Sequence, residues 1–386
     1  MNPPDYSPLE LLERLVAFDT TSHKSNLGLI RFVEDYLTQC KVGCQILPSA
    51  DGSKASLFAT IGPAGVSGVA LSGHTDVVPV EGQEWASDPF RLTDAGERVI
   101  GRGAADMKGF LACVLAAVPS FTARALKVPV HLAFSYDEEI GCVGVRPMIA
   151  AFGTRLVKPA MVIVGEPTSM GVVDAHKGPV RWQIEIKGRP AHSSMAHLGV
   201  NAIAAAGRIV AELAGIEEAL KTEPDQRFTP PYASLQVTRI EGGIAANIVP
   251  AAAVLGFEVR ALPQTDVAAI EARLHRFATE ELLPQMRAVA PEADISIRQM
   301  NRVAPFTAEP HSALTALALK LAGQNQTFAV SYATEAGFFQ SGGSAAIICG
   351  PGDIAQAHTA NEWIAKSELV RCSSFLDRLG GWCEAP

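Results

Sequence analysis

The sequence predicts an α/β protein with a mostly parallel central sheet, helices on both faces of that sheet, and a smaller α+β domain inserted into the chain. Short, continuously apolar runs alternate with longer helical patterns in the first and last parts of the chain, as buried parallel strands and their crossover helices do. Between about Gly178 and Met300, apolar and polar residues alternate instead. The length of 386 residues also exceeds what one hydrophobic core usually holds.

The larger domain begins with two predicted helices. Ser7 is an N-cap residue type, and it precedes apolar residues at helical spacing, namely Leu11, Leu12, Leu15 and Val16. A second helical pattern covers about Leu29 to Gln39. Four later runs, GVALSG, VPVHLAFS, AMVIVGE and AAIICG, are brief, apolar and followed by turn residues, so we expect buried strands there. A predicted helix over Met107–Val118 separates the first two runs.

The middle of the chain predicts the element order β-α-β-β-α-β. RWQIEIKG alternates like a half-exposed strand, and NAIAAAGRIVAELAGI has a helical pattern. Two strand patterns (ASLQVTRIEGG and AAVLGFEVRAL), a helical one (DVAAIEARLHRFATEELL) and a last strand (ADISIRQM) follow. This is the order of a split-βαβ sandwich, with one sheet face exposed or used for association. We therefore expect a larger domain in two parts, residues 1–177 and 301–386, around an inserted domain, residues 178–300.

Composition and net charge exclude some classes of function and some classes of partner. Hydrophobic residues make up 48% of the chain and charged residues 19%, the balance of a folded soluble enzyme. The net charge of −8 argues against nucleic acid or an anionic membrane as the main partner. Seven cysteines without a CxxC spacing favour a reducing compartment. The N-terminal MNPPDYSPLE lacks the features of a signal peptide, and the longest apolar stretch, around Phe110–Phe121, is too short to span a bilayer, so we expect a cytoplasmic protein.

Residue types that bind metal ions follow the predicted central strands. In an open α/β sheet the carboxyl ends of parallel strands face one crevice, so side chains placed there converge. A further carboxylate, Asp106, lies in the glycine-rich turn GRGAADMKG before a predicted helix. The converging set has two histidines and three carboxylates: His74, Asp106, Glu139, Glu166 and His358. A lone His74 would indicate an ordinary buried histidine, whereas five such residues in equivalent positions indicate a metal centre.

Two imidazoles and three carboxylates can hold two metal ions if one carboxylate bridges them. Asp106 has a short side chain between Gly103 and Gly109, which suits the bridging position. The other four ligands then divide into one histidine and one glutamate per ion, His74 with Glu166 and His358 with Glu139. Nitrogen and oxygen donors without a thiolate favour zinc, with cobalt or manganese as alternatives.

Two acidic residues beside these ligands have different predicted roles. Asp76 lies two residues after His74 and is expected to orient its imidazole. Glu138 adjoins Glu139 but is expected to stay off the metals, where it takes a proton from the attacking water and delivers it to the leaving amine. Taken alone, the segment YDEE indicates a solvated acidic loop, and the other ligands make the catalytic interpretation the better one.

Five segments, SGHTDVVP, GRGAADMKG, YDEEIGCVG, VGEPT and QAHTANEW, resemble in the same order the motifs of the di-zinc aminoacylase and deacetylase family of metallopeptidases. The resemblance extends from the first third of the chain to His358. It implies the ligand set above, with Asp106 as the bridge and Glu138 as the base. It also implies that residues 178–300 form a dimerisation (lid) domain, so we expect a homodimer that acts on a small N-acylated amino acid.

The inserted domain carries residues to which the resemblance assigns a function. GRPAHSSMAHLGVNA matches the family segment in which a histidine, here His192, reaches the partner's active site and polarises the scissile carbonyl. Asn247 in NIVP and Arg260 in FEVRALP match positions that contact substrate, Arg260 by pairing with a carboxylate. Outside this context His192 is a surface-loop histidine and Arg260 a member of a surface ion pair.

The residues expected to lie near the acyl group of the substrate indicate which substrate is bound. GPGDIAQAHTANEWI is similar to the branch of the family that removes the acetyl group from N2-acetyl-L-ornithine, giving L-ornithine and acetate in arginine biosynthesis. By the same resemblance, desuccinylases of the family have an arginine at the position of Phe338 in this chain. The apolar ring of phenylalanine cannot balance the charge of a succinyl carboxylate. Glu335 either meets the ornithine ammonium or is a solvated loop carboxylate. The alternatives are another N-acyl-amino-acid deacylase, such as a succinyl-diaminopimelate desuccinylase, a dipeptidase, or a non-catalytic metal-binding relative.

Overall fold

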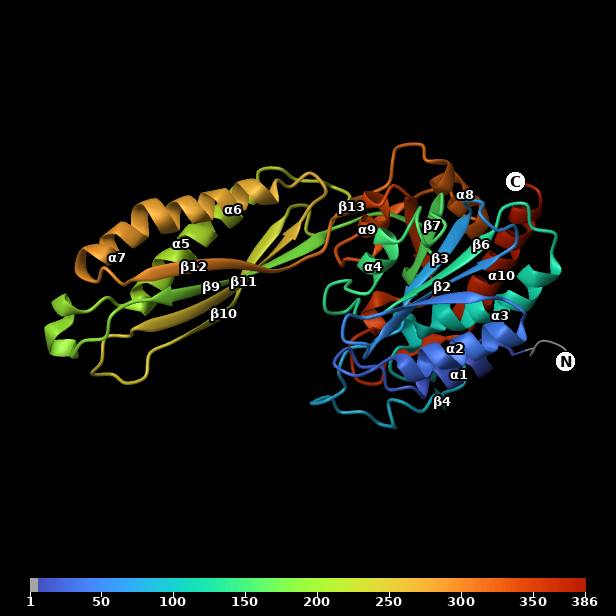
Figure 1. Ribbon diagram of the computed structural model, residues 1–386, viewed down its shortest axis with the longest axis horizontal. Helices are drawn as coiled ribbons and strands as arrows, with labels where there is room; N and C mark the ends of the chain where they lie inside the picture. Colours follow the sequence, from blue (N-terminus) through green and yellow to red (C-terminus); the bar gives the residue numbers. More distant parts are fainter. Residues whose placement is uncertain (1–5) are drawn as a thin grey trace. The chain divides into compact units, whose positions relative to one another are not determined.

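Four parallel strands form the centre of the larger sheet in the computed structural model, which describes residues 6–386 (Figure 1). Neighbouring strands pair in the order β6 (Val130–Ser135), β3 (Val69–His74), β7 (Met161–Pro167) and β15 (Ala345–Gly350). All four are buried along nearly their whole length, which explains why each has a continuous apolar sequence. These are the four strands predicted from the sequence, and the predicted fold class is confirmed.

Further strands extend this sheet on both sides. β1 (Cys44–Pro48) and β2 (Ala55–Ile61) continue it beyond β6. β8 (Val173–His176) pairs with β15, and both β13 (Phe306–Thr307) and β14 (Phe328–Val330) pair with β8. A separate small sheet contains β4 (Thr93–Asp94), β5 (Arg98–Ile100) and β16 (Trp363–Ala365). The sequence patterns did not indicate these strands. Except for β2, they have two to five residues, which is too few for a clear apolar run.

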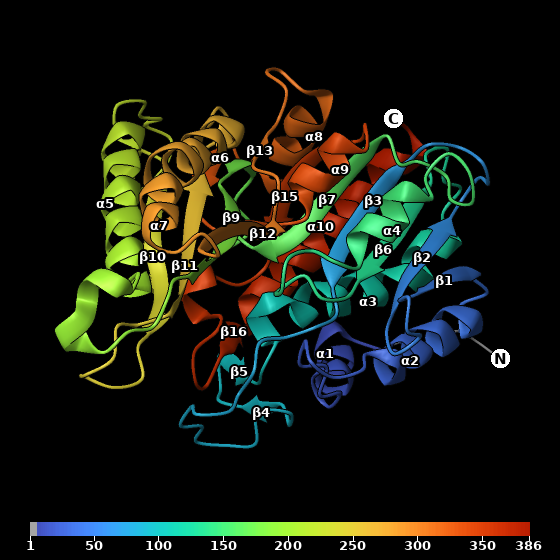
Figure 2. The same ribbon diagram turned by 60° about the vertical axis from the view of Figure 1, so that its left-hand side comes forward.

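Helices cover both faces of the central sheet (Figures 1 and 2). One face is covered by α1 (Pro8–Val16), α2 (Leu27–Gln39), α3 (Gly109–Ala123), α8 (Ala313–Ala322) and α10 (Lys366–Glu384), whose apolar side chains share one core. The other face is covered by α4 (Val145–Ala150) and α9 (Ala336–Ser341). The short turns η1 (Ala104–Lys108) and η4 (Ile354–Gln356) lie before α3 and after β15. Ser7 caps α1 as expected, because its hydroxyl accepts a hydrogen bond from the Glu10 amide (3.3 Å).

The described residues form two compact units. The first consists of the residues up to Asp174, Thr307–Phe328 and Thr334–Pro386. It contains the elements above, except that β8, β13 and β14 are each divided between the two units. The second consists of Ala175–Phe306 and Ala329–Ala333. Its four-stranded sheet is antiparallel throughout, in the order β10 (Ser234–Gly242), β11 (Ala252–Ala261), β9 (Gly178–Lys187) and β12 (Asp294–Arg302).

Helices pack on one face of the sheet of the second unit (Figure 2). They are α5 (Ala202–Leu220) and a continuous run of α6 (Val267–Arg276), η3 (Phe277–Leu282) and α7 (Leu283–Val289), with the short turn η2 (Ser193–Leu198) before α5. The element order is β-α-β-β-α-β, as expected. Side chains on the opposite face are largely exposed, and in β9 these include Arg181, Glu185 and Lys187, which alternate with buried core residues. The alternation in the sequence therefore reflects a sheet that is buried on one side.

Together with η1, α3 forms an apolar helical segment of 20 residues, Ala104–Ala123. By length and composition such a segment can cross a membrane, so the expectation that the apolar stretch around Phe110–Phe121 is too short was wrong. Burial decides the matter instead. Of its most apolar window, 78% lies inside the protein, where the helix packs against the sheet, α1 and α10. The segment is a core helix of the first unit.

The central sheet contains a buried imidazole, His131 of β6. It is fully buried, its Nδ1 is 2.9 Å from the hydroxyl of Thr60, and its ring stacks on Phe58 with centroids 5.3 Å apart. Its Nε2 has no hydrogen-bond partner among residues 6–386. Burial lowers the pKa of His131 to about 4, so the ring is neutral in the folded protein at ordinary pH.

We expect His131 to make the protein sensitive to acid. Its pKa is about 4 when folded and near 6.5 when unfolded, so between these values the unfolded chain binds the proton preferentially. The contribution to stability is complete above pH 6.5 and is lost as the pH falls toward 4. His131→Phe, which has no titratable ring, should reduce the loss of unfolding free energy between pH 7.5 and pH 5 by about 2 kcal/mol. Urea unfolding of both proteins at the two pH values measures this difference. Equal losses would contradict the prediction.

Candidate metal centre

The predicted ligands lie together at the carboxyl ends of the parallel strands. His74 is the last residue of β3, Glu139 follows β6, and Glu166 lies near the end of β7. His358 follows β15 and η4, and Asp106 lies in η1 just before α3. The parallel topology explains this convergence, because every strand of such a sheet delivers its last residues to the same edge.

The Asp106 carboxylate lies between the two histidines. Its Oδ1 is 2.9 Å from Nε2 of His74, and its Oδ2 is 3.2 Å from Nε2 of His358. Nε2 of His358 is also 3.1 Å from Oε1 of Glu139, and Nε2 of His74 is 3.8 Å from Oε1 of Glu166. One ligand atom from each of His74, Asp106 and Glu139 lies within 4.8 Å of the other two. A carboxylate that faces one histidine with each oxygen has the arrangement that a bridging ligand needs.

The cluster has more buried negative charge than its histidines balance. Burial, with the neighbouring charge of Asp106 as the next cause, raises the pKa of both Glu139 and Glu166. Oε1 of Glu166 is buried and has no hydrogen-bond partner among the described residues. Hydrogen bonds to Asp106 and then Glu139 raise the pKa of His358 to about 11. Divalent cations fit this donor set, because they would balance the carboxylates and give Glu166 the partner that it lacks.

Asp76 joins the end of β3 to the turn after β6. Nδ1 of His74 is 2.9 Å from the main-chain oxygen of Asp76 and 3.5 Å from its carboxylate, so the carbonyl is the nearer group that orients the ring. The Asp76 carboxylate accepts hydrogen bonds from the Ser22 hydroxyl (2.7 Å) and from the amides of Glu138 (3.1 Å) and Glu139 (3.4 Å). Asp76 thereby holds His74 and the Glu138–Glu139 turn in a fixed relation.

Glu138 lies beside the cluster, and its contacts differ from those of the ligands. Within the described part of the chain, its carboxylate makes no hydrogen bond or ion pair with His74 or His358, whereas the adjacent Glu139 contacts His358. Burial, opposed by the charge of His74 and assisted by that of Glu139, raises the pKa of Glu138 well above its ordinary value. A carboxyl group with a raised pKa binds a proton more readily than an ordinary carboxylate, as a general base requires.

Glu362, to which no sequence pattern assigned a role, holds the turn that contains Asp106. Its side chain is 1% exposed. Oε1 accepts hydrogen bonds from the amides of Ala105 (2.9 Å) and Asp106 (3.0 Å). Oε2 accepts from the Gly103 amide (3.0 Å) and the Arg102 guanidinium (2.8 Å). One carboxylate thus serves four donors of a single turn. Its only sequence signal is its place in QAHTANEW, four residues after His358.

The backbone of His358 is held by a second set of contacts. Gln83 donates from Nε2 to the His358 carbonyl (2.9 Å), and the guanidinium of Arg102 donates to the side-chain oxygen of Gln83. The Asn361 side chain accepts a hydrogen bond from the Ala86 amide (2.7 Å). These contacts surround a residue with a φ of 61°, which is uncommon outside glycine and is maintained only where neighbouring structure fixes it.

Glu335 is buried, so the alternative of a solvated loop carboxylate was wrong. The residue lies at the start of α9 and is 1% exposed. Its carboxylate accepts hydrogen bonds from the hydroxyls of Ser72 in β3 (3.1 Å) and Ser135 in β6. Burial raises the pKa of Glu335 to about 7. The two serines therefore fasten α9 to the strands that precede His74 and the Glu138–Glu139 turn.

The predicted functional residues of the inserted domain belong to the second unit. His192 is exposed, and its Nδ1 is 2.8 Å from the Ser194 hydroxyl. Asn247 is also exposed, and its carbonyl accepts a hydrogen bond from the Ser193 amide (3.0 Å), so the two segments are adjacent. Arg260 donates from Nε to Glu258 on the same strand (2.6 Å). Within this unit His192 and Asn247 lie close together, and Arg260 is paired with a carboxylate.

Phe338 has a cation on its ring, a contact that no sequence pattern indicated. Phe338 is half-buried in α9, and the guanidinium of Arg146 in α4 lies 4.8 Å from the ring centroid. Arg146 also donates hydrogen bonds to the carbonyls of Gly141 (2.7 Å) and Cys142 (3.2 Å). Arg146 therefore connects the turn after Glu138 with the ring of Phe338.

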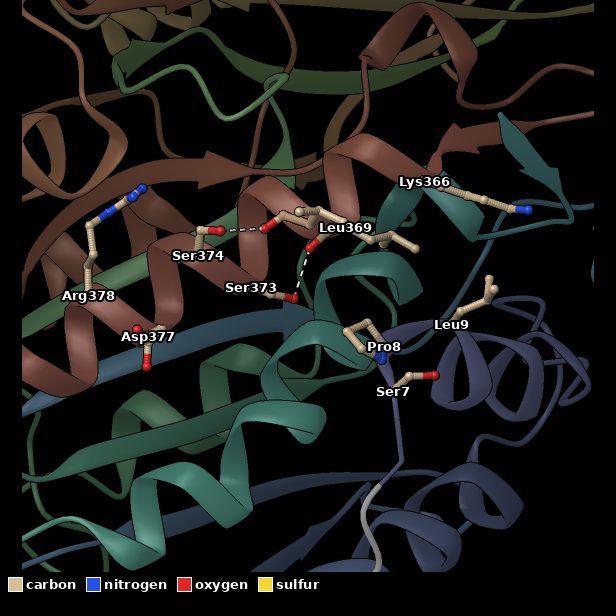
Figure 3. Close-up of a pocket in the computed structure, with 10 residues that line it drawn as sticks. Ser7, Pro8, Leu9, Lys366, Leu369, Ser373, Ser374, Asp377 and Arg378 are labelled. Atoms are coloured by element: carbon tan, nitrogen blue, oxygen red, sulfur yellow. Dashed lines mark hydrogen bonds between the residues drawn. The ribbon is translucent and has the colours of Figure 1, made fainter. Parts of the chain in front are cut away.

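A groove of about 690 Å³ lies between the start of α1 and α10 (Figure 3). Leu369 and Val370 contribute apolar surface to it. The hydroxyls of Ser373 and Ser374 are hydrogen-bonded to carbonyls of their own helix (2.9 Å each). None of the candidate metal ligands lines this groove.

Comparison with known proteins agrees with this geometry. The sequence model of peptidase family M20/M25/M40 matches residues 70–380 of the chain. An acetylornithine deacetylase from Myxococcus xanthus is 33% identical over 379 residues, which cover 95% of each chain. One from Proteus mirabilis (strain HI4320) is 32% identical over 378 residues, 97% of this chain and 94% of the relative.

Solved structures show the same fold at lower identity. An M20 family metallo-carboxypeptidase from Sulfolobus solfataricus has a TM-score of 0.77 at 19% identity, covering 99% of this chain and 100% of the other. A dinuclear metal binding peptidase of the M20 family from Bacillus subtilis has a TM-score of 0.70 at 17% identity, with 97% and 96% covered.

We expect Glu362→Gln to destabilise the first unit. The amide nitrogen cannot accept the hydrogen bonds that one carboxylate oxygen accepts, and the buried Arg102 loses its counter-charge. Breaking a buried pair from one side costs about 3–5 kcal/mol of unfolding free energy. Urea unfolding of metal-free protein measures this loss, and elemental analysis after metal loading should show weakened retention.

Glu368→Gln is the matched control for this variant. Glu368 also makes an ion pair, but its partner Arg371 is 49% exposed, so the loss should stay below about 1 kcal/mol. A loss for Glu362→Gln as small as that of the control would contradict the role of Glu362.

Proposed function

This chain belongs to the peptidase family M20/M25/M40, and we propose that it is a two-metal amide hydrolase that removes the acetyl group from N2-acetyl-L-ornithine to give L-ornithine and acetate. The identity of 33% to an acetylornithine deacetylase across 95% of both chains is the observation that carries this substrate assignment. The position of Asp106 between His74 and His358 supports the two-metal chemistry.

The donor set fits two metal ions with one shared ligand. His74, Glu166 and Asp106 would hold one ion, and His358, Glu139 and the same Asp106 the other. When bound, the ions polarise the amide carbonyl and lower the pKa of water. Nitrogen and oxygen donors without a thiolate favour zinc, with cobalt or manganese as alternatives.

Glu138 is the proposed proton carrier of the reaction. In the hydrolysis, the water oxygen bonds to the acetyl carbon, the C–N bond breaks, and the amine nitrogen gains a proton. Glu138 accepts a proton from the attacking water and passes it to that nitrogen. The raised pKa of Glu138 supports both steps, and Asp76 supports the orientation of its turn.

Phe338 favours a small neutral acyl group over a charged one. A succinyl group would bring a second carboxylate to the acyl side, where an apolar ring offers it no hydrogen bond. The nearby Arg146 donates to two main-chain carbonyls and stacks on the ring, so those contacts would have to change before it paired with a succinyl group. An acetyl group makes no such demand.

The second unit is proposed to complete the site in a cytoplasmic homodimer. His192 would polarise the scissile carbonyl in the partner's active site. Asn247 and Arg260 would contact substrate, with Arg260 exchanging Glu258 for the substrate carboxylate. These roles rest on the family motifs around the three residues.

The substrate proposal predicts a clear preference among N-acylated amino acids. We expect kcat/KM for N2-acetyl-L-ornithine to exceed that for N-succinyl-diaminopimelate at least about 100-fold, because the second carboxylate would be buried without a partner. Amine release measures both rates, and a chelator should abolish them until zinc or cobalt is restored. Comparable rates on the succinyl substrate, or preferred cleavage of dipeptides, would point to another deacylase or a dipeptidase. Metal binding without any hydrolysis would indicate a non-catalytic relative.

A second prediction separates the proposed base from the ligands. Glu138→Ala should keep about two metal ions per chain and lose roughly 10²–10⁴-fold in kcat, since the proton transfer acts in the transition state. Glu139→Ala is the control, and it should lose metal together with activity. Elemental analysis and steady-state kinetics on both variants distinguish them. Loss of metal from Glu138→Ala and retention by Glu139→Ala would reverse the two roles.

A further inference from the structure

The turn that follows β6 places the buried thiol of Cys142 next to the Glu138 side chain. The amides of Gly141 and Cys142 both donate to the main-chain oxygen of Glu138, at 2.8 and 2.9 Å. Two further main-chain hydrogen bonds, from Val143 to Asp137 (3.0 Å) and from Gly144 to Tyr136 (2.9 Å), close the turn. The backbone therefore fixes residue 142 relative to the carboxylate of residue 138.

Cys142 occupies a backbone conformation that favours glycine. Its φ is 54°, in the left-handed region where a β-carbon is unfavourable, yet its side chain is 1% exposed. A residue that keeps a side chain at such a position is held there by what the side chain contacts. The contact is specific: Sγ of Cys142 is 3.4 Å from Oε1 of Glu138 in hydrogen-bond geometry.

The thiol is the one side-chain hydrogen-bond donor to the Glu138 carboxylate in the part of the chain that the structure describes. The charged groups that face this carboxylate include His74 and the acidic residues Glu139, Glu335, Asp106 and Glu166. Repulsion from the acidic groups would turn Glu138 away unless a donor retained it. Burial and then the charge of Glu138 raise the pKa of Cys142 well above its ordinary value, so the sulfur keeps its proton and remains a donor.

We propose that Cys142 is a positioning residue, whose thiol donates a hydrogen bond to Glu138 and holds the proton carrier in its working orientation. This inference rests on the proposed role of Glu138. No bond to sulfur forms or breaks during the reaction. The contribution is to the fraction of enzyme molecules in which Glu138 is correctly aimed, and therefore to kcat more than to substrate binding.

The kinetic test compares two replacements of Cys142. Cys142→Ala removes the donor and should lower kcat about tenfold, with KM and metal content nearly unchanged. Cys142→Ser retains a donor and should recover most of that loss. Cys383→Ala is the matched control, because Cys383 is equally buried in α10 and no carboxylate is hydrogen-bonded to it, so its kcat should equal that of the parent. Equal kcat values for Cys142→Ala and the parent would overturn the proposal.

An infrared measurement on metal-free protein tests the hydrogen bond without activity. The S–H stretching band of Cys142 is obtained as the difference between spectra with and without this cysteine, with Cys142→Ser or Cys142→Ala as the reference. In the Glu138→Ala background the band should move to higher frequency, because the thiol has lost its acceptor. A band at the same frequency in both backgrounds would overturn the proposal, even if the Cys142 variants were too unstable for kinetics.

The two sets of variants separate this inference from the function on which it rests. If Glu138→Ala hydrolyses substrate at the parent rate, Glu138 is not the proton carrier. The proposed roles of Glu138 and of Cys142 then both fail. If Glu138→Ala is inactive while Cys142→Ala is fully active, only the role of Cys142 fails. A substrate other than N2-acetyl-L-ornithine leaves the infrared result unaffected and moves the kinetic test to that substrate.

Discussion

The buried carboxylate of Glu362 is the contact on which the candidate site depends most. A charge removed from water is stable only when donors surround it, and three amides and a guanidinium of one turn supply them. The same contacts fix the backbone of Asp106, which lies 256 residues away in sequence. Arg102 links this contact to His358, because its guanidinium also donates to Gln83, which in turn donates to the His358 carbonyl.

Buried carboxylates in this protein differ in whether protein groups donate hydrogen bonds to them, and this difference helps to separate structural carboxylates from a proposed ligand. Asp76 has hydroxyl and amide donors, and Glu335 has two serine hydroxyls. Glu166 is buried as well, at 4% exposure, but its Oε1 accepts no hydrogen bond from the described residues. Burial alone therefore does not identify a ligand in this protein. A buried oxygen that accepts no hydrogen bond from the protein, beside other ligand atoms, does point to one.

The fold and the candidate ligands could be predicted because their signals are local. β3, β6, β7 and β15 are continuous apolar runs, and the polar residues that follow them must share one edge of a parallel sheet. Glu362, Cys142 and Arg146 could not be assigned, because their partners are set by turns and helix packing that no spacing reveals. The burial of Glu335 could not be predicted for the same reason. Its sequence is typical of a loop, and its contacts with serines of two strands depend on tertiary packing.

The division of the first unit into stretches on either side of the second has a consequence for synthesis. The second unit is nearly one continuous stretch, Ala175–Phe306, with a core of its own, so it can fold while the ribosome is still translating. β15 and His358 emerge only afterwards. During that interval β7 has no neighbour on one side, and an unpaired apolar strand edge promotes association between chains. Yield in the cell should therefore depend on how quickly the last stretch of chain closes that edge, or on a chaperone that covers it in the meantime.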